Sequence, residues 1–291
     1  MSAQTTIKIS WLMAAGVFLS ACGSNRYAAT NRQYKQQVKA LAQELQQPLP
    51  YATPPLVTTY DSTGAVTVTT DPNARNDARW VGSINFNLRK PNFVVIHHTA
   101  QDSLEQTLNT FTVPHTEVSA HYVIGRNGEV YQMLNDYVRA WHAGAGRWGN
   151  VTDLNSVSLG IELDNNGNEP FSEAQIQSLL NVLNTLKTKY NIPTANFIGH
   201  SDVAPTRKVD PSALFPWKRL AENGFGYWPT APLETPPEHF NPVDALRIIG
   251  YDTSNLDAAI KAFELHYIQD EVDGELTDAD LQVLYNLYLY Y

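Results

Sequence analysis

The pattern of hydrophobic positions between residues 92 and 200 predicts strands that alternate with a helix. Residues 93–96 form an uninterrupted apolar, β-branched run, which is typical of a strand buried on both faces. Residues 157–163 alternate apolar and polar positions with a period of two, which predicts a strand whose polar face carries Glu162. A capping box at Ser172 and Gln175 then begins a stripe of leucines at helical spacing.

Three further runs predict more strands of the same sheet. Residues 119–124 and 129–134 flank an Asn127-Gly128 dipeptide, the strongest short signal for a hairpin. Residues 196–199 form another apolar run, which ends at His200. Strands that alternate with helices in this way indicate an α/β fold, in which a mixed central sheet is flanked by helices.

The pattern changes on both sides of this region. After proline-rich residues 229–237, three short helical patterns predict a small C-terminal three-helix domain. Residues 31–47 favour a helix that prolines terminate, and Thr- and Val-rich residues 57–70 favour a hairpin at the edge of the sheet. We therefore expect four parts: a leader at 1–21, a tether and N-terminal extension at 22–79, a main α/β domain at 80–230, and a helical domain at 238–291.

The first residues have the features of a bacterial lipoprotein leader. Lys8 precedes an apolar run of thirteen residues, which is the length of a signal sequence and shorter than the roughly 20 residues of a spanning helix. Leu19-Ser20-Ala21-Cys22 resembles a lipobox, in which the cysteine carries the lipid. We therefore expect cleavage before Cys22 and lipid anchoring through it, with an ordinary secretory signal as the alternative.

Charge and cysteine content exclude several classes of protein. The chain of 291 residues has a formal charge of -9, and residues 238–291 alone carry eleven acidic and two basic side chains. Nucleic-acid binding is therefore not expected, because no excess of positive charge is available for phosphates. A single cysteine excludes an internal disulfide framework, so stability must come from packing, to which a metal bound by histidines and carboxylates could add.

Two predicted strands end in histidines, and an aspartate follows closely. His97, His200 and Asp210 would give a metal ion two imidazoles and one carboxylate, which leaves a tetrahedral zinc ion one open position for water. His98 competes with His97, but adjacent residues of a strand point to opposite faces, so one of the two should face the metal. On spacing alone, a histidine at the end of a strand is more often a structural residue than a metal ligand.

Five motifs in one order resemble the type 2 amidase family of zinc N-acetylmuramoyl-L-alanine amidases. They are VVIHHTA at 94–100, SAHYVI at 119–124, RAWHAG at 139–144, GIEL at 160–163 and HSDVAPTRKVDP at 200–211. The resemblance covers roughly residues 80–220. Together with the lipobox and the C-terminal helices, it is strongest to the outer-membrane lipoproteins of this family that act on anhydro-muramyl peptides.

The resemblance implies a role for each motif residue. It makes His97, His200 and Asp210 the ligands of one zinc ion, Glu162 the general base and Lys208 the group that stabilises the oxyanion. It implies that peptidoglycan or muropeptides are the substrate and that the protein lies on the periplasmic face of the outer membrane. Aromatic and imidazole groups suit sugars and N-acetyl groups, so His121, Trp141 and His142 are candidates for the substrate cleft. We expect a monomer.

Two other functions stay open at this stage. A peptidoglycan recognition module would bind without cutting, but all three ligand positions are filled here. A zinc peptidase would cut within the stem peptide, although the spacing of His97 and His200 differs from the two-histidine helix motif of many metalloproteases. The C-terminal helices either bind peptidoglycan or only pack against the catalytic domain.

Overall fold

The computed structural model describes residues 26–46, 56–60, 62–63, 66–70, 85, 87–88 and 90–291. The chain divides into two compact units, residues 1–84 and 85–291, and each is considered by itself. The predicted leader and Cys22 lie outside the described residues. Among the described residues, no helix is both long and apolar enough to cross a membrane.

The first unit contains one helix and one hairpin. Helix α1 (Ala28–Glu44) confirms the helix predicted at 31–47, and it has no buried residue. Strands β1 (Leu56–Tyr60) and β2 (Val66–Thr70) pair antiparallel, which confirms the hairpin. The prediction that this hairpin lies at the edge of the main sheet is wrong, because its two strands form a sheet of their own.

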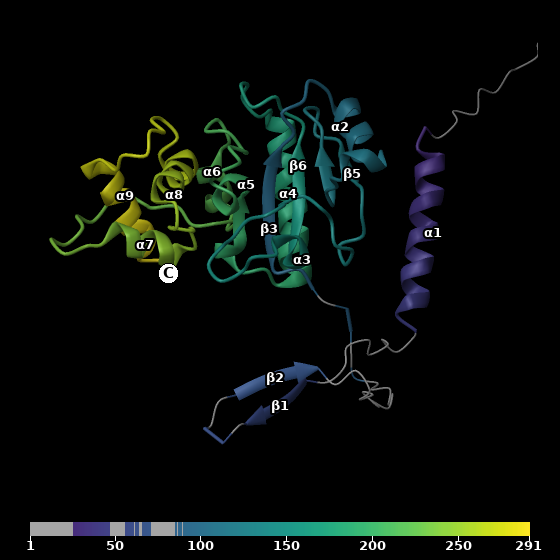
Figure 1. Cartoon of the computed structure of the whole chain (residues 1–291). Coiled ribbons are helices and arrows are strands. Elements are labelled where there is room, and N and C mark those ends of the chain that lie inside the picture. Colours follow the sequence, from purple (N-terminus) through teal and green to yellow (C-terminus); the bar gives the residue numbers. More distant parts are fainter. Residues whose placement is uncertain are drawn as a thin grey trace, which may run out of the picture. The chain divides into compact units, whose positions relative to one another are not determined.

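The second unit is built on a five-stranded mixed sheet in the order β5-β4-β6-β3-β7 (Figure 1). The strands are β3 (Phe93–His98), β4 (Tyr122–Ile124), β5 (Val130–Gln132), β6 (Ser158–Leu163) and β7 (Phe197–Gly199). Strands β4, β6, β3 and β7 run parallel, and β5 pairs antiparallel with β4 through the predicted hairpin. The predicted mixed sheet is confirmed.

Helices connect and cover these strands. They are α2 (Leu104–Thr110), α3 (Leu154–Val157), α4 (Glu173–Tyr190), α5 (His200–Val203) and α6 (Trp217–Glu222), with short 3-10 turns at Pro114–Thr116 and Thr194–Asn196. Helix α4 begins after Ser172, whose side chain accepts a hydrogen bond from the backbone of Gln175, as the capping box predicts. His200 does not end a strand as expected, because the chain turns at Gly199 and His200 is the first residue of α5.

The C-terminal segment has the three predicted helices and one unpredicted π-helical turn. The elements are α7 (Pro242–Ile249), α8 (Leu256–Phe263), the π-helix η3 (Glu264–Ile268) and α9 (Asp278–Tyr288). Asn241 and Thr277 cap α7 and α9 through side-chain hydrogen bonds.

Two apolar clusters lie on opposite faces of the sheet. The first joins side chains such as Val94, Ile96 and Leu159 to the buried stripe of α4. The second joins Val95 and Ile198 of the sheet and Val203 of α5 to the C-terminal helices. The consequence is visible in Figure 1, where α5 lies between β3 and the yellow-green helices α7, α8 and α9.

Candidate metal centre

The register of two central strands brings together two side chains of the predicted site. Strands β3 and β6 are parallel neighbours, and His97 pairs with Glu162. Paired residues of neighbouring strands point to the same face of a sheet. Since Val95 belongs to the cluster that includes the C-terminal helices, His97 and Glu162 lie on that face as well. His98 points to the other face, where its Nδ1 accepts a hydrogen bond from the backbone of Ser212.

Three buried side chains converge from distant parts of the chain. The Nδ1 atoms of His97 and His200 are 2.9 Å apart, and Asp210 Oδ2 lies 3.1 Å from the first and 3.0 Å from the second. The backbone carbonyl of Asp210 accepts a hydrogen bond from Ser201 N, which ties the aspartate to helix α5. The group predicted from the sequence is therefore assembled in space.

The triangle of donor atoms fits a tetrahedral metal ion. Bonds of about 2.0–2.1 Å in such an ion place two donor atoms about 3.3 Å apart. The three distances of 2.9–3.1 Å approach one face of that tetrahedron. Two imidazole nitrogens and one carboxylate oxygen are also the donor types that divalent transition metals accept, and a fourth position is left over for a water or a substrate atom.

A chain of hydrogen bonds fixes the tautomer of His97. The Ser158 hydroxyl donates to the carbonyl of Leu154, so its oxygen is available to accept from His142 Nε2 at 3.1 Å. His142 Nδ1 then has a lone pair, and it accepts from His97 Nε2 at 3.1 Å. The remaining nitrogen of His97, Nδ1, consequently presents its lone pair to the triangle of donor atoms.

His200 is oriented through a backbone carbonyl. Its Nε2 donates to Ala143 O at 3.0 Å, which leaves the Nδ1 lone pair facing Asp210 and His97. The segment that carries this carbonyl is held by the buried Asn155, whose Oδ1 accepts from the backbone of both His142 and Ala143. Sequence reasoning did not find Asn155 or Ser158, because neither belongs to a recognisable ligand pattern.

Burial and hydrogen bonding shift the pKa values of two of the three donors, His97 and Asp210. Burial, followed by the nearby His200, lowers the pKa of His97 to about 4, so the imidazole is neutral near pH 7. Burial alone would raise the pKa of Asp210, but the hydrogen bonds from His200 and His97 outweigh it and hold that pKa well below the usual range. Neutral imidazoles and an ionised carboxylate are the states in which these side chains bind metals.

The surroundings of Glu162 give this carboxyl group an unusual proton affinity. Burial, and then the negative charge of Asp210, raise the pKa of Glu162 to about 8, although Lys208 opposes the shift. Lys208 is half-buried, and its charge also acts on the pKa of His97. Glu162 and Lys208 are therefore both within electrostatic reach of the donor triangle. A carboxyl group with a pKa near the working pH suits general acid and base chemistry.

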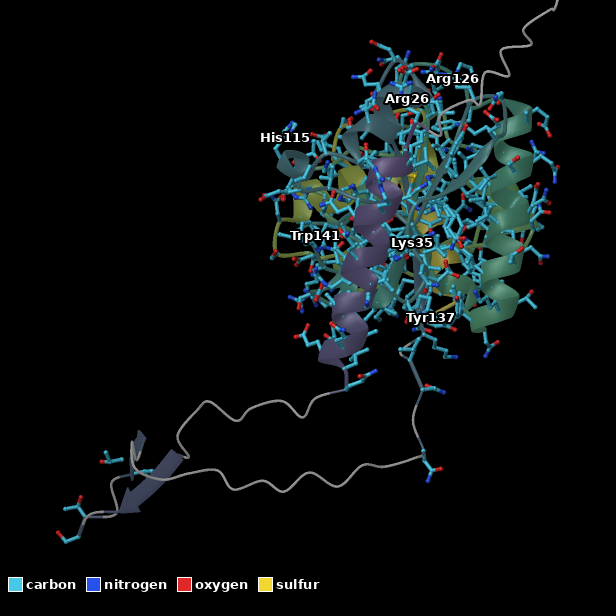
Figure 2. The ribbon with its side chains drawn as sticks, turned by 90° about the vertical axis from the view of Figure 1, so that its right-hand side faces the viewer. Arg26, Lys35, His115, Arg126, Tyr137 and Trp141 are labelled. Carbon is cyan, nitrogen blue, oxygen red and sulfur yellow. The ribbon has the colours of Figure 1, made fainter. Side chains whose placement is uncertain are left out.

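The predicted cleft residues occupy different environments. His121 is buried, its Nδ1 accepts from Gly160 N, and its Nε2 donates to Val138 O. His142 is also buried, and its two ring nitrogens bind His97 and Ser158. Trp141 is 54% exposed, and Figure 2 shows its side chain at the surface. Trp141 is therefore available to a ligand in solution, whereas both histidines have partners inside the protein.

This arrangement defines a class of site: two histidines and one aspartate that could hold one metal ion, with a carboxyl group of raised pKa on the neighbouring strand. The family model described as N-acetylmuramoyl-L-alanine amidase matches residues 87–213, which include all of these groups.

Two curated relatives agree with that match. N-acetylmuramoyl-L-alanine amidase AmiD of Escherichia coli (strain K12) is 34% identical over 223 residues, which are 66% of this chain and 79% of the relative. 1,6-anhydro-N-acetylmuramyl-L-alanine amidase AmpD of Haemophilus influenzae is 40% identical over 103 residues, which are 35% of this chain and 56% of that protein. The chain belongs to the N-acetylmuramoyl-L-alanine amidase family.

Solved structures match a larger share of the chain than the family model does. A complex of E. coli AmiD with anhydro-N-acetylmuramic acid-L-Ala-D-gamma-Glu-L-Lys matches with a TM-score of 0.62 and 28% identity, covering 80% of this chain and 97% of that one. AMPDH3 from Pseudomonas aeruginosa matches with a TM-score of 0.64 and 26% identity, covering 77% and 99%. The predicted fold is confirmed by these matches.

Proposed function

We propose that this protein is an N-acetylmuramoyl-L-alanine amidase, which hydrolyses the amide bond between N-acetylmuramic acid, or its anhydro form, and L-alanine in peptidoglycan or its fragments. The observation that carries the proposal is the triangle of His97, His200 and Asp210 beside Glu162, in a chain of the amidase family. AmiD and AMPDH3 have been solved with anhydromuramyl peptides, which supports peptidoglycan fragments as the substrate class here.

Zinc is the metal that the donor set favours. His97 and His200 would each bind through Nδ1, and Asp210 through Oδ2. When bound, a zinc ion supplies Lewis-acid chemistry, which polarises a carbonyl and acidifies water. The donor types and their spacing support one ion, since three donors around 3 Å apart suit a single tetrahedral site.

Glu162 and Lys208 would have different roles: Glu162 would transfer protons, and Lys208 would stabilise negative charge. Glu162 takes a proton from the attacking water, whose oxygen forms a bond to the carbonyl carbon, and returns the proton to the amine as the C–N bond breaks. A pKa raised to about 8 supports the second half of that cycle, because a group with such a proton affinity holds the proton until the amine takes it. Lys208 would stabilise the negative charge that develops on the carbonyl oxygen. The products are a free carboxylate on the lactyl group and a peptide that begins with L-alanine.

We also propose which residues contact the substrate and which parts of the chain carry catalysis and binding. Exposure supports Trp141 as a contact for a sugar or peptide, and we retain His121 and His142 as cleft candidates. We assign catalysis to residues 80–230 and treat residues 238–291 as a peptidoglycan-binding-like domain. A monomer is the proposed state of the protein.

We also propose a lipid anchor at Cys22 and a location on the periplasmic face of the outer membrane. Support comes from the lipobox at residues 19–22 and from the position of the single cysteine within it. A thioether-linked diacylglycerol with an additional N-acyl chain would be a stable attachment.

Mass spectrometry of muropeptide digests tests the proposed reaction. Soluble protein without residues 1–22 is incubated with muramyl and anhydro-muramyl peptides, with and without a metal chelator. The expected product is a free stem peptide that begins at L-alanine, abolished by chelation and restored by zinc. Cleavage between peptide residues would instead identify a peptidase. Intact substrate from zinc-loaded protein that still pulls down peptidoglycan would identify a recognition module.

A further inference from the structure

A carboxylate with no exposed surface lies directly behind the metal centre. Asp202 belongs to helix α5, which begins with His200. Its Oδ2 accepts a hydrogen bond from Gly199 N at 2.6 Å, and this contact closes the turn from which His200 projects. A buried carboxylate is costly unless hydrogen bonds satisfy it, so its other partners matter for the geometry of this turn.

Both of the other partners come from the C-terminal helical segment. Tyr251 Oη donates to Asp202 Oδ1 at 2.9 Å, and His266 Nδ1 donates to Asp202 Oδ2 at 2.8 Å. The two donors are separated from Asp202 by 49 and 64 positions in the sequence. Residues 238–291 therefore complete the hydrogen bonding of a side chain that lies two residues after a metal-ligand candidate.

The ring of His266 is packed between two aromatic rings. The ring stacks on Trp217 with centroids 3.8 Å apart and 15° between the planes, and on Tyr267 at 4.1 Å and 12°. His266 lies in the π-helix η3, a rare geometry that occurs frequently at functional sites. These contacts fix the plane of the ring, so that Nδ1 is directed at Asp202.

Tyr251 is fixed just as firmly. It is buried, and its ring packs edge-on against Trp148 with centroids 5.0 Å apart. It follows Gly250, whose positive φ of 138° ends helix α7. A Cβ atom at Gly250 would lie 2.4 Å from Trp148, so glycine is required for the close approach that brings Tyr251 to Asp202.

We propose that the C-terminal helical segment is a positioning element of the metal centre, acting through Tyr251 and His266 on Asp202 and through Asp202 on the Gly199–His200 turn. The segment would then raise metal affinity whether or not it also binds peptidoglycan. The proposal rests on the proposed metal site, but it is independent of the bond that the enzyme cuts. Groups that orient a metal ligand typically contribute a factor of about 10 to 100 to metal affinity.

Substitutions that keep ring packing test this role. Tyr251→Phe removes one hydroxyl group, and His266→Phe keeps a ring between Trp217 and Tyr267 but removes the donor nitrogen. Zinc affinity is measured in the full chain by competition with a chromophoric chelator, and unfolding of the metal-free protein is measured alongside it. We expect zinc affinity to fall severalfold in each single variant and about 10- to 100-fold in the double variant.

The matched control is Tyr285→Phe, which removes a hydroxyl group from the same segment at a ring that contacts Phe240. Its zinc affinity should equal that of the unsubstituted protein. Variants that lose stability but bind zinc within twofold of the unsubstituted protein would overturn the proposal, because the role would then be structural.

If the double variant does not fold, Tyr251→Phe alone decides by the same criterion. An unsubstituted protein that binds no zinc would overturn the proposed function itself, which separates the two failures.

Discussion

The Nε2 atom of His97 lies 3.1 Å from Nδ1 of His142, on the side of the imidazole away from Asp210. His142 is therefore in contact with the ring that presents Nδ1 to the metal centre, and its partner Ser158 determines which of its nitrogens carries the proton. In the chain from His97 through His142 and Ser158 to the carbonyl of Leu154, each group donates to the next one. The Leu154 carbonyl therefore determines which nitrogen of His97, 57 positions earlier in the sequence, keeps its lone pair.

Loss of this support should weaken metal binding. His142→Ala removes the acceptor of the His97 proton, and we expect zinc affinity to fall about 10- to 100-fold. Ser158→Ala leaves His142 in place without its acceptor, so the expected loss is smaller and in the same direction. Chelator competition measures both, with the exposed Ser156→Ala as the control. Unchanged affinity in His142→Ala would show that the contact does not orient the ligand.

The imidazole ring of His142 packs directly against Gly160, where there is no side chain. A Cβ atom on Gly160 would lie 2.4 Å from Cγ of the imidazole, so Gly160→Ala must displace the ring or the strand. We expect weaker zinc binding together with a stability loss of about 1–3 kcal/mol, which is typical of overpacking. Chelator competition and urea unfolding measure the two effects. As a control for zinc binding, Gly149→Ala adds a Cβ that has no described atom within 4 Å, at a φ of +55°, so it strains the backbone without displacing a ring and should leave zinc affinity unchanged. Full metal affinity in Gly160→Ala would contradict the expected ring displacement.

The carboxyl group of Glu162 should lower the stability of the metal-free protein near neutral pH. Its pKa is about 8 in the folded protein, above the value of about 4.3 in an unfolded chain. The unfolded state therefore ionises first, and the stability of the metal-free protein falls as the pH rises from about 4.5 to 8. Glu162→Gln should abolish most turnover, retain zinc, and stabilise the metal-free protein by about 2–3 kcal/mol near pH 7 and by little near pH 4.5.

Urea unfolding of chelator-treated protein at the two pH values measures the stability change, and Glu222→Gln at an exposed site is the control. A Glu162→Gln variant with near-normal turnover would remove Glu162 from its role as the base.

Asp136 anchors a polar cluster far from the metal ligands in the sequence. It accepts hydrogen bonds from Tyr122 and Tyr190, each at 2.6 Å, and from Lys189 at 3.0 Å. Burial opposes its ionisation, but these bonds prevail and hold the pKa of Asp136 below its usual range. Asp136→Asn should destabilise the protein by about 2–3 kcal/mol at pH 7.

The sign of the pH dependence follows from that lowered pKa. The stabilisation by Asp136 is complete above the unfolded-state value of about 3.9 and is lost as the pH falls through the folded-state pKa. The difference between Asp136→Asn and the unsubstituted protein should therefore shrink below about pH 4. Asp270→Asn at an exposed site is the control for urea unfolding. A difference that stays constant down to pH 3 would contradict this account.

The proposed anchor at Cys22 has a direct test. Cys22→Ala in the complete chain should move the protein from the membrane pellet to the soluble fraction, because the lipid attachment is lost. Fractionation after a high-salt wash measures this, and Ser24→Ala, two residues further on, should leave the protein in the pellet. Continued pelleting of Cys22→Ala would contradict the lipid anchor.

The sequence predicted most of the sheet and the convergence of His97, His200 and Asp210. Strands with clear periodicity, such as β3 and β6, leave a strong signal, and the amidase motifs carry the ligand positions. Helices α3 and α5 were missed because four residues are too few to show a helical repeat. The position of His200 at a helix start depends on the turn at Gly199, which no local pattern indicates.

The contacts around the site were harder to predict than the site itself. His142 was predicted only as a candidate for the substrate cleft, and its bonds to His97 and Ser158 were not expected, because the motif gives no information on where the ring points. His266 received no role, because its partner Asp202 is 64 positions away and is itself an ordinary acidic residue in the sequence. Pairs of this kind depend on the packing of whole elements.

The apolar cluster shared by the sheet and the C-terminal helices has a consequence for dissecting this enzyme. Val95 and Ile198 of the sheet pack in the same cluster as Leu246 and Phe263 of α7 and α8. A fragment cut at residues 229–237 would expose this cluster to water on both pieces and would be prone to aggregate. The two segments should therefore melt in a single cooperative transition. Low activity of an enzyme truncated in this way would therefore be explained first by an exposed apolar core. It would not show that residues 238–291 bind peptidoglycan.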